Sequence, residues 1–321
     1  MKTVIIDNSL CAYPLRDNAD PDLIYHYICA LKDSGVKYIE LDFRTLMKLR
    51  RLPEGVEYIF RMVDPMFLQL SDFFDFKYIV LTYNDLRKRI KTKIPIMFEL
   101  PYAGGSFERV VGFVQKHADG ELAAFRIRSA FDYYRPAETS LIYREICSSL
   151  MPYPVDVCPL NMNKTALDAA LKFTAANADS VTLTAGLSTK YCSLEEYFFA
   201  LMTLFDSLPK EFDIQSLGRV SVYRSRIFQT GEQALPRLLE ILDHDIRCLK
   251  NADTGDRVAM RVGLKDTEYL GHQFVSALEK MADMEDIPDE LYEDITGAIR
   301  HFDRGIYNDD ILYKKRSGLL N

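Results

Sequence analysis

The segment Ala123-Ala124-Phe125-Arg126-Ile127-Arg128 alternates apolar and charged side chains with a period of two. That period is typical of a β-strand, whose successive side chains point to opposite faces. Short apolar runs of this kind recur about every 25 residues, with helical patterns between them. The eight runs lie at residues 3–7, 37–42, 57–63, 77–83, 95–100, 123–128, 155–158 and 180–184. Eight such βα units predict an α/β fold, the closed (β/α)8 or TIM barrel.

Helical stripes fill the intervals between the runs. Residues 22–34 carry apolar side chains three and four positions apart, and Gly35 follows as a stop signal. Similar patterns predict helices at residues 107–117, 139–150, 165–177 and 193–208. Together with the strands, these helices complete a barrel over residues 1–210.

Beyond residue 210 the βα pattern ends. Val220–Tyr223 is typical of a strand, and small amphipathic helices are predicted at residues 269–284, 288–303 and 309–316. We therefore expect a mainly helical C-terminal subdomain over residues 211–321. Such a subdomain commonly caps a barrel or pairs subunits, and we expect it to support a homodimer.

The composition excludes several classes of function. A formal net charge of -7 without a polybasic tract argues against a nucleic-acid-binding or membrane-surface protein. The chain has no long apolar segment, so we expect a cytoplasmic protein with no membrane partner. Its six cysteines are scattered without a Cys-x-x-Cys pair, which predicts reduced thiols and no metal cluster.

Charged side chains on the strands are the candidates for a functional site. Because Phe125 and Ile127 should face the helices, the period of two turns Arg126 and Arg128 into the barrel. The same argument turns Glu40 and Asp42 inward, with Arg61 and Glu99 as candidates to join them. Buried charges must be paired, because an unpaired one costs several kcal/mol. Two interpretations remain open, a structural ion-pair network or a ligand site at the carboxyl ends of the strands.

Specific roles follow from residue type and position. Arg128 is nearest the carboxyl end of its strand, and its planar guanidinium matches a carboxylate or phosphate. The other candidate substrate-binding residues are Arg126, Arg61, Asn161 and Thr184, and the candidate catalytic residues are Glu40, Asp42 and Glu99. We expect a small anionic ligand and no bound cofactor or metal, because no HExxH or GxSxG motif is present and the five histidines fall mainly on predicted helices or turns.

Three segments carry a family resemblance. Residues 4–10 (Val-Ile-Ile-Asp-Asn-Ser-Leu), 34–40 (Ser-Gly-Val-Lys-Tyr-Ile-Glu) and 176–196 resemble the homocitrate synthase and isopropylmalate synthase family of barrels. They correspond to its first strand (Asp-Thr-Thr-Leu-Arg-Asp-Gly), its second βα junction, and its seventh helix through eighth helix. Residues 290–312 are similar to the helical subdomain that helps the family dimerise. The resemblance implies condensation of a 2-oxo acid with an acyl-CoA on a divalent cation.

The family's metal-binding motifs are degenerate in this chain. Its first-strand arginine and metal-binding aspartate fall on Cys11 and Ala12, and its His-x-His-Asn motif falls on Cys158-Pro159-Leu160-Asn161. Its sixth-strand Asp-Thr-x-Gly falls on residues 129–132, and its Gly-Glu-Arg turn on residues 186–189. A second register places Arg16-Asp17 on the Arg-Asp pair, but well beyond the strand end. We therefore expect the usual divalent-metal site to be absent.

Three functions are compatible with the sequence. The first is a divergent synthase-like enzyme that performs acyl transfer or carbon–carbon bond formation on a small carboxylated substrate, with an acyl-CoA as co-substrate and without the usual metal. The second is a non-catalytic relative that acts as a partner or regulator of an active synthase. The third is a TIM-barrel lyase or epimerase of other ancestry, because barrels recur across many chemistries.

Overall fold

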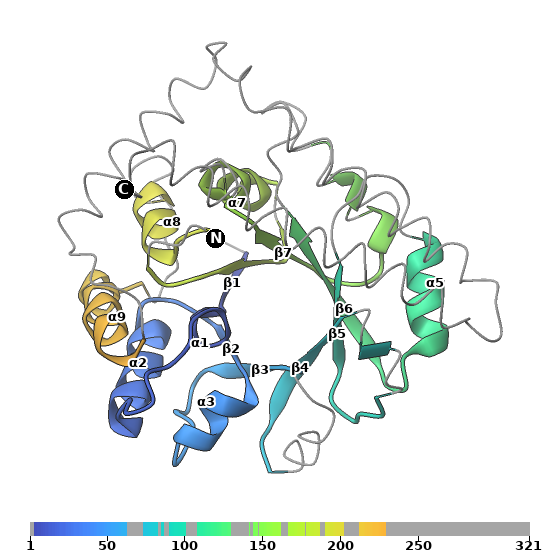
Figure 1. Cartoon of the computed structure of the whole chain (residues 1–321). Helices are drawn as coiled ribbons and strands as arrows, with labels where there is room; N and C mark the ends of the chain where they lie inside the picture. The colour runs from blue at the N-terminus through green and yellow to red at the C-terminus, as the bar shows by residue number, and fades with distance from the viewer. Residues whose placement is uncertain are drawn as a thin grey trace, which may run out of the picture.

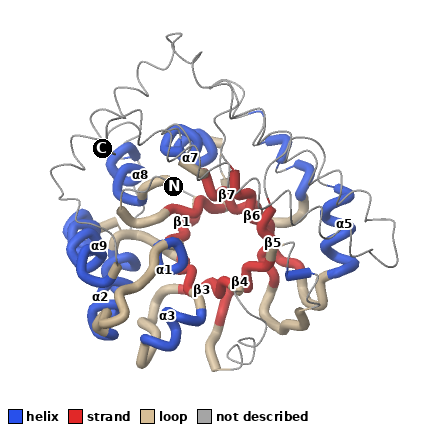
Figure 2. Tube along the Cα trace, in the orientation of Figure 1, coloured by secondary structure: helices blue, strands red, loops and turns tan. Residues whose placement is uncertain are grey.

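A closed ring of eight parallel strands forms the centre of the computed structural model (Figure 1, Figure 2). The structure describes residues 3–62, 73–82, 85–86, 90–100, 108–129, 141, 144–146, 148–161, 166–176, 178–186, 190–201 and 212–228. The strands pair in chain order from β1 to β8, and β8 pairs with β1 to close the ring. The predicted (β/α)8 barrel is confirmed.

Each strand overlaps one of the predicted apolar runs. The strands are β1 (Val4–Asp7), β2 (Tyr38–Leu41), β3 (Glu57–Arg61), β4 (Phe76–Leu81), β5 (Ile96–Leu100), β6 (Leu122–Ser129), β7 (Val155–Pro159) and β8 (Ser180–Leu183). β5, β7 and β8 are buried along their whole length and the other strands over more than half of theirs, which is why the strands appear in the sequence as near-continuous apolar runs.

Helices surround the barrel on its outer side (Figure 2). They are α1 (Ser9–Ala12), α2 (Pro21–Asp33), α3 (Phe43–Lys48), α5 (Glu108–His117), α7 (Ala166–Ala175), α8 (Leu194–Ala200) and α9 (Ile214–Ile227). The predictions at residues 22–34, 107–117 and 165–177 match α2, α5 and α7. The carboxylate of Asp20 accepts from the Asp22 N–H and Pro21 follows at the first turn, two signals that start α2.

The strand predicted at Val220–Tyr223 is wrong, because these residues belong to α9. Asp213 caps this helix by accepting from the backbone N–H groups of Gln215 and Ser216. Leu217, Val220, Arg224 and Ile227 are buried at helical spacing, and α9 packs against α2 (Figure 1). The local alternation at residues 220–223 was overruled by the cap and by this packing.

The helix α9 begins after the predicted domain boundary at residues 210/211 and lies in the ring of helices around the barrel. The backbone of Phe228 bridges to Leu15, and the Arg16 Nε donates to the Phe228 carbonyl oxygen at 2.8 Å. The helices predicted at 269–284, 288–303 and 309–316 lie outside the described residues. The division into a barrel and a C-terminal subdomain therefore stays a prediction.

Two apolar clusters sit on opposite sides of the strands. The larger one fills the layer between strands and helices and includes Ile39, Phe125 and Val157. The smaller one lies inside the ring and takes one residue each from five strands, namely Ile6, Ile59, Val80, Met97 and Ala124. This inner cluster, which we call the apolar floor, leaves the carboxyl-end half of the interior to polar side chains.

Among the described residues, no helix has the length and apolar character needed to cross a membrane.

Candidate functional site: an ion-pair cluster inside the barrel

Three arginines and three carboxylates meet inside the ring. They lie on the side of the apolar floor that faces the carboxyl ends of the strands. Each lies on a strand at a position whose neighbours face the helix layer, as strand alternation requires. We call this set the lumen cluster: Glu40 on β2, Arg61 on β3, Glu99 on β5, Arg126 and Arg128 on β6, and Asp156 on β7. The carboxyl ends of barrel strands are where barrel enzymes place their active sites.

Arg126 forms the deep part of the lumen cluster, and its side chain is 0% exposed. Its Nε donates to Asp156 Oδ2 at 2.5 Å, and its Nη1 donates to Glu40 Oε2. The hydroxyls of Ser180 and Thr182 on β8 donate to the same Asp156 carboxylate, at 2.9 and 2.6 Å. With its carboxylates paired this closely, the deep part is organised as a structural ion-pair network.

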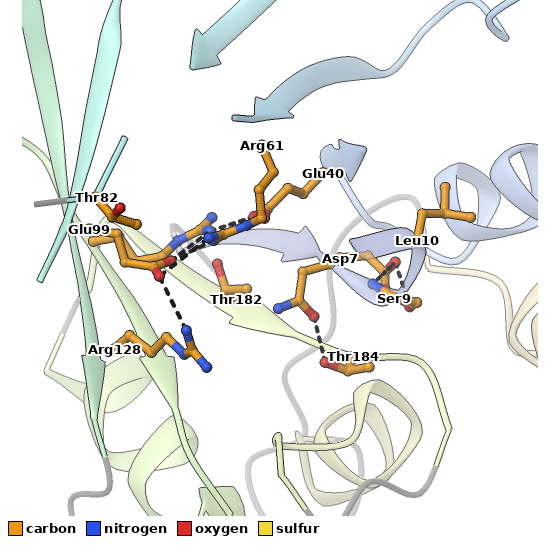
Figure 3. Close-up of polar contacts among 12 residues, drawn as sticks. Asp7, Ser9, Leu10, Glu40, Arg61, Thr82, Glu99, Arg128, Thr182 and Thr184 are labelled. Atoms are coloured by element: carbon orange, nitrogen blue, oxygen red, sulfur yellow. Dashed lines mark hydrogen bonds and ion pairs between the residues drawn. The ribbon is translucent and has the colours of Figure 1, made fainter. Parts of the chain in front are cut away.

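The other two arginines lie nearer the mouth of the barrel, with side chains 22% (Arg61) and 21% (Arg128) exposed. Arg61 donates through Nε to Glu40 and through Nη2 to Glu99 Oε2 at 2.5 Å. Arg128 reaches Glu99 Oε1 only at 3.4 Å and the Tyr191 hydroxyl at 3.3 Å. Figure 3 shows Arg61 linked to Glu40 and Glu99, and Arg128 approaching Glu99 separately. Arg128 is therefore partly open to solvent, and its contacts with Glu99 and Tyr191 are long.

The arginines set the protonation state of the two glutamates. Burial acts to raise the pKa of Glu40, but the Arg126 and Arg61 guanidiniums outweigh it and the pKa is lowered. Burial likewise opposes ionisation of Glu99, and Arg61 and Arg128 overcome it, so its pKa also lies below the usual range. Both candidate catalytic glutamates are thus ionised at neutral pH and are weak proton acceptors while the cluster is intact.

The remaining predicted site residues, Asp42, Thr184 and Asn161, have partners outside the lumen cluster. Asp42 follows the last residue of β2, and its Oδ1 caps α3 by accepting from the backbone N–H of Thr45 at 2.9 Å. The expectation that Asp42 points inward extended the strand alternation one residue past the strand end. Thr184 is buried and donates to Asn8 Oδ1 at 2.5 Å. The Asn161 backbone N–H donates to the Lys190 carbonyl oxygen at 2.9 Å, beside the loop that carries Tyr191.

Sequence reasoning missed two residues of the site. Asp156 was within its reach, because Val155 and Val157 face the helix layer and the period of two turns Asp156 inward. Tyr191 had no sequence signal, because it lies in a loop. The backbone bridge between Leu160 and Tyr191 holds this loop beside the end of β7, where Tyr191 contacts Arg128. Burial raises the pKa of Tyr191 to about 12, so its hydroxyl is a neutral donor.

The positions that align with the family's metal ligands do not fit a divalent cation. Burial raises the pKa of the Cys158 thiol to about 12 and that of Cys11 well above its usual value, so both are protonated. Neutral thiols, Ala12 and Leu160 supply none of the oxygen ligands that hard cations require. In the described ranges, no three His, Cys, Asp or Glu side chains form a metal-binding group.

The alternative Arg16-Asp17 register fares no better. The Lys48 ammonium binds the backbone carbonyl oxygens of both residues at 3.0 Å. The Arg16 side chain is bound instead to the end of α9, through the carbonyl oxygens of Ser225 and Phe228. The Arg16 side chain is therefore bound to the end of α9 and does not take the place of the motif's arginine.

Comparisons with known proteins identify the fold of the chain. No protein-family model matches the sequence, and no curated protein matches it either. The HMG-CoA lyase of Bacillus subtilis is 12% identical, with a TM-score of 0.52 over 76% of this chain and 99% of that one. The hydroxymethylglutaryl-CoA lyase of Pseudomonas aeruginosa is 12% identical, with a TM-score of 0.52 over 75% and 98%. The carboxyl transferase domain of Rhizobium etli pyruvate carboxylase is 10% identical, with a TM-score of 0.50 over 88% and 60%. At these identities the likeness establishes the shared barrel.

Proposed function

We propose that the chain is a divergent relative of the homocitrate and isopropylmalate synthase barrels. In this proposal it forms or breaks a carbon–carbon bond in a small carboxylated substrate, without the family's divalent cation. The observation that carries the proposal is Arg128, a guanidinium that is 21% exposed near the carboxyl end of β6. Two of the barrels that share the fold are named as lyases of an acyl-CoA and one as a carboxyl transferase, which favours this chemistry over others.

Arg128 is suited to bind the substrate carboxylate. Its donor–acceptor distances to Glu99 and Tyr191, 3.4 and 3.3 Å, are longer than the distance of about 2.8 Å that is typical of charge-assisted hydrogen bonds. A ligand carboxylate at the shorter distance would bind this guanidinium more tightly than Glu99 and Tyr191 do. Tyr191 supports the position of Arg128, because the guanidinium carbon lies 5.7 Å from the centre of the Tyr191 ring.

The same mouth carries groups that can stabilise negative charge on a reacting oxygen. Arg61 donates to Glu99, and the neutral Tyr191 hydroxyl, which accepts from Arg128, keeps a proton that it can donate. Donors fixed in place before the reaction are worth most where water is scarce. We propose that they hold the oxyanion or enolate that carbon–carbon chemistry at a carbonyl compound produces, and that an acyl-CoA is the second substrate.

Thermal unfolding with candidate ligands tests this function, because a ligand that binds the folded chain raises its melting temperature. We expect stabilisation by a 2-oxo acid such as pyruvate, and further stabilisation by acetyl-CoA. Arg128→Ala should abolish the effect of pyruvate while the circular dichroism spectrum stays unchanged. The matched control is Lys77→Ala, which removes a cation of the exposed Lys77–Glu57 pair and should leave ligand stabilisation intact. Equal stabilisation of wild type and Arg128→Ala would exclude Arg128 as the anchor.

A non-catalytic partner or regulator of a synthase is the second candidate. It is favoured by the pairing of the lumen charges with one another and by the low pKa values of Glu40 and Glu99, which leave neither as an effective base. In that case pyruvate and acetyl-CoA should not stabilise the chain, and no variant of Arg128 should change this.

We also propose a homodimer formed through the C-terminal residues, which light scattering of the full chain would test.

A further inference from the structure

Glu99 is the carboxylate on which the arginines of the mouth converge. Arg61 contacts both of its oxygens, at 2.5 and 3.3 Å, and Arg128 contacts Oε1 at 3.4 Å. Arg126 approaches Oε2 at 3.6 Å from the deep side. The Glu99 side chain is 6% exposed whereas that of Glu40 is 0% exposed, so Glu99 is the carboxylate of this pair that faces the mouth.

The charges of the lumen cluster balance. Its three guanidiniums and three carboxylates sum to zero, and among the residues that the structure describes the Cys158 thiol and the Tyr191 phenol beside Glu99 are neutral. An anion that binds Arg128 adds negative charge beside Glu99. It also competes for one of the guanidiniums that keep Glu99 ionised, and in a largely buried site this repulsion is poorly screened.

We propose that a small carboxylate binds at Arg128 with uptake of one proton from solvent onto the Glu99 carboxylate. This inference rests on the proposed function and deepens it. Protonated Glu99 can keep one oxygen as an acceptor for Arg61 and donate its O–H to the bound ligand. Glu40 remains ionised, because Arg61 and Arg126 both donate to it from the side away from the ligand.

The proton changes what Glu99 can do. An ionised Glu99 repels an anionic substrate, whereas a protonated one is a carboxylic acid held beside the substrate's reacting oxygen. Substrate binding would thereby create the acid that the site lacks when empty. Glu99 then serves as a proton donor to an enolate or alkoxide oxygen, and the arginines hold the resulting carboxylate.

Calorimetric titration of oxalate into the full chain tests the coupling. Oxalate is a dianion in neutral solution, so it carries no proton to the site, and comparison with Glu99→Gln shows whether a proton taken up depends on Glu99. Titrations in Tris and in HEPES, which differ in ionisation enthalpy, should show uptake of about one proton per oxalate. The association constant should then fall about tenfold for each unit by which the pH is raised, over the pH range in which the proton is taken up. Glu99→Gln should bind oxalate without proton uptake and without this pH dependence. The matched control Glu57→Gln, at a half-exposed carboxylate on β3, should behave as wild type.

The outcomes separate this inference from the function on which it rests. Oxalate binding that is lost in Arg128→Ala but takes up no proton would overturn the coupling and leave the proposed function standing. Proton uptake that persists in Glu99→Gln would also overturn it, because another group would then be the acceptor. Absence of oxalate binding, or binding indifferent to Arg128→Ala, would contradict both proposals.

Discussion

Two buried polar clusters lie on opposite sides of the barrel wall. The lumen cluster lies inside the ring, and an outer cluster lies between β1, β8 and the helices. The outer cluster consists of Asp7, Ser9, Tyr27, Glu195 and Arg224. Figure 3 shows Asp7 and Ser9 apart from the Arg61–Glu99 contacts. Both clusters bury carboxylates, but their pKa values shift in opposite directions.

The partners of the carboxylates explain the difference. Asp7 accepts from the Ser9 hydroxyl at 2.6 Å and from the backbone N–H of Ala185 at 3.1 Å, and Glu195 accepts from the backbone N–H of Gly186 at 2.6 Å. Burial raises the pKa of Asp7 to about 7 and also raises that of Glu195, because the neutral donors, and for Glu195 also the Arg224 guanidinium, offset only part of the desolvation. In the lumen, the guanidiniums outweigh the same burial at Glu40 and Glu99. The direction of the pKa shift therefore depends on whether the facing guanidiniums outweigh the cost of burial.

The largest expected effect is the loss of the deep arginine. Arg126→Met leaves Glu40 and Asp156 without their shared partner, and removing one member of a buried ion pair costs about 3–5 kcal/mol. Urea unfolding of the variant measures this loss. Lys77→Met, which removes an exposed ion pair, should cost less than about 1 kcal/mol. Equal losses in the two variants would mean that the lumen cluster contributes no special stability.

The second prediction concerns pH and the outer cluster. The Asp7 pKa is raised from 3.8 to about 7, so the folded chain holds this proton more tightly than the unfolded chain between those values. The stability that this group contributes is therefore full below the lower value and falls as pH rises, by about 1.4 kcal/mol per pH unit, until it is lost above the higher value. Asp7→Asn should remove that slope from urea unfolding followed at several pH values. An unchanged slope would show that Asp7 is ionised across this range.

Gly186 gives a third, smaller effect at the other end of the outer cluster. Its φ is +88°, and a Cβ at this position would lie 2.0 Å from Arg224 Cζ. Gly186→Ala should therefore strain the backbone and displace the guanidinium, at a cost of about 1–3 kcal/mol. Gly218→Ala is the matched control, because a Cβ there meets nothing within 4 Å and α9 should be stabilised slightly. Thermal unfolding of both variants compares them, and equal melting temperatures would contradict the close packing of Arg224.

The smallest expected effect on stability is that of Arg128→Ala. This side chain is 21% exposed and its contact with Glu99 is 3.4 Å long, so the loss should stay below about 1 kcal/mol. Side-by-side urea titrations with Arg126→Met would sharpen the contrast between the deep part of the lumen cluster and its mouth. A loss as large as that of Arg126→Met would identify Arg128 as a structural residue and weaken the case for a ligand site there.

The sequence by itself determined the eight strands and the faces of their side chains. Alternation is a local property of the backbone, so the inward placement of Glu40, Arg61, Glu99 and Arg126 required no knowledge of the rest of the chain. The same argument, applied to β7, would have included Asp156. It failed at Asp42, one residue past a strand end, where a helix cap replaces strand geometry.

Only the tertiary structure decided which charges meet. Ring closure and strand register bring Arg126 on β6 to Glu40 on β2 and Asp156 on β7, and a loop brings Tyr191 to Arg128. The pKa directions follow from those meetings and not from residue type, since the pKa values of Glu40 and Glu99 shift downward in the lumen whereas those of Asp7 and Glu195 shift upward in the outer cluster. A side chain's direction is set by its own strand, whereas its partner is set by strands that lie far away in the sequence.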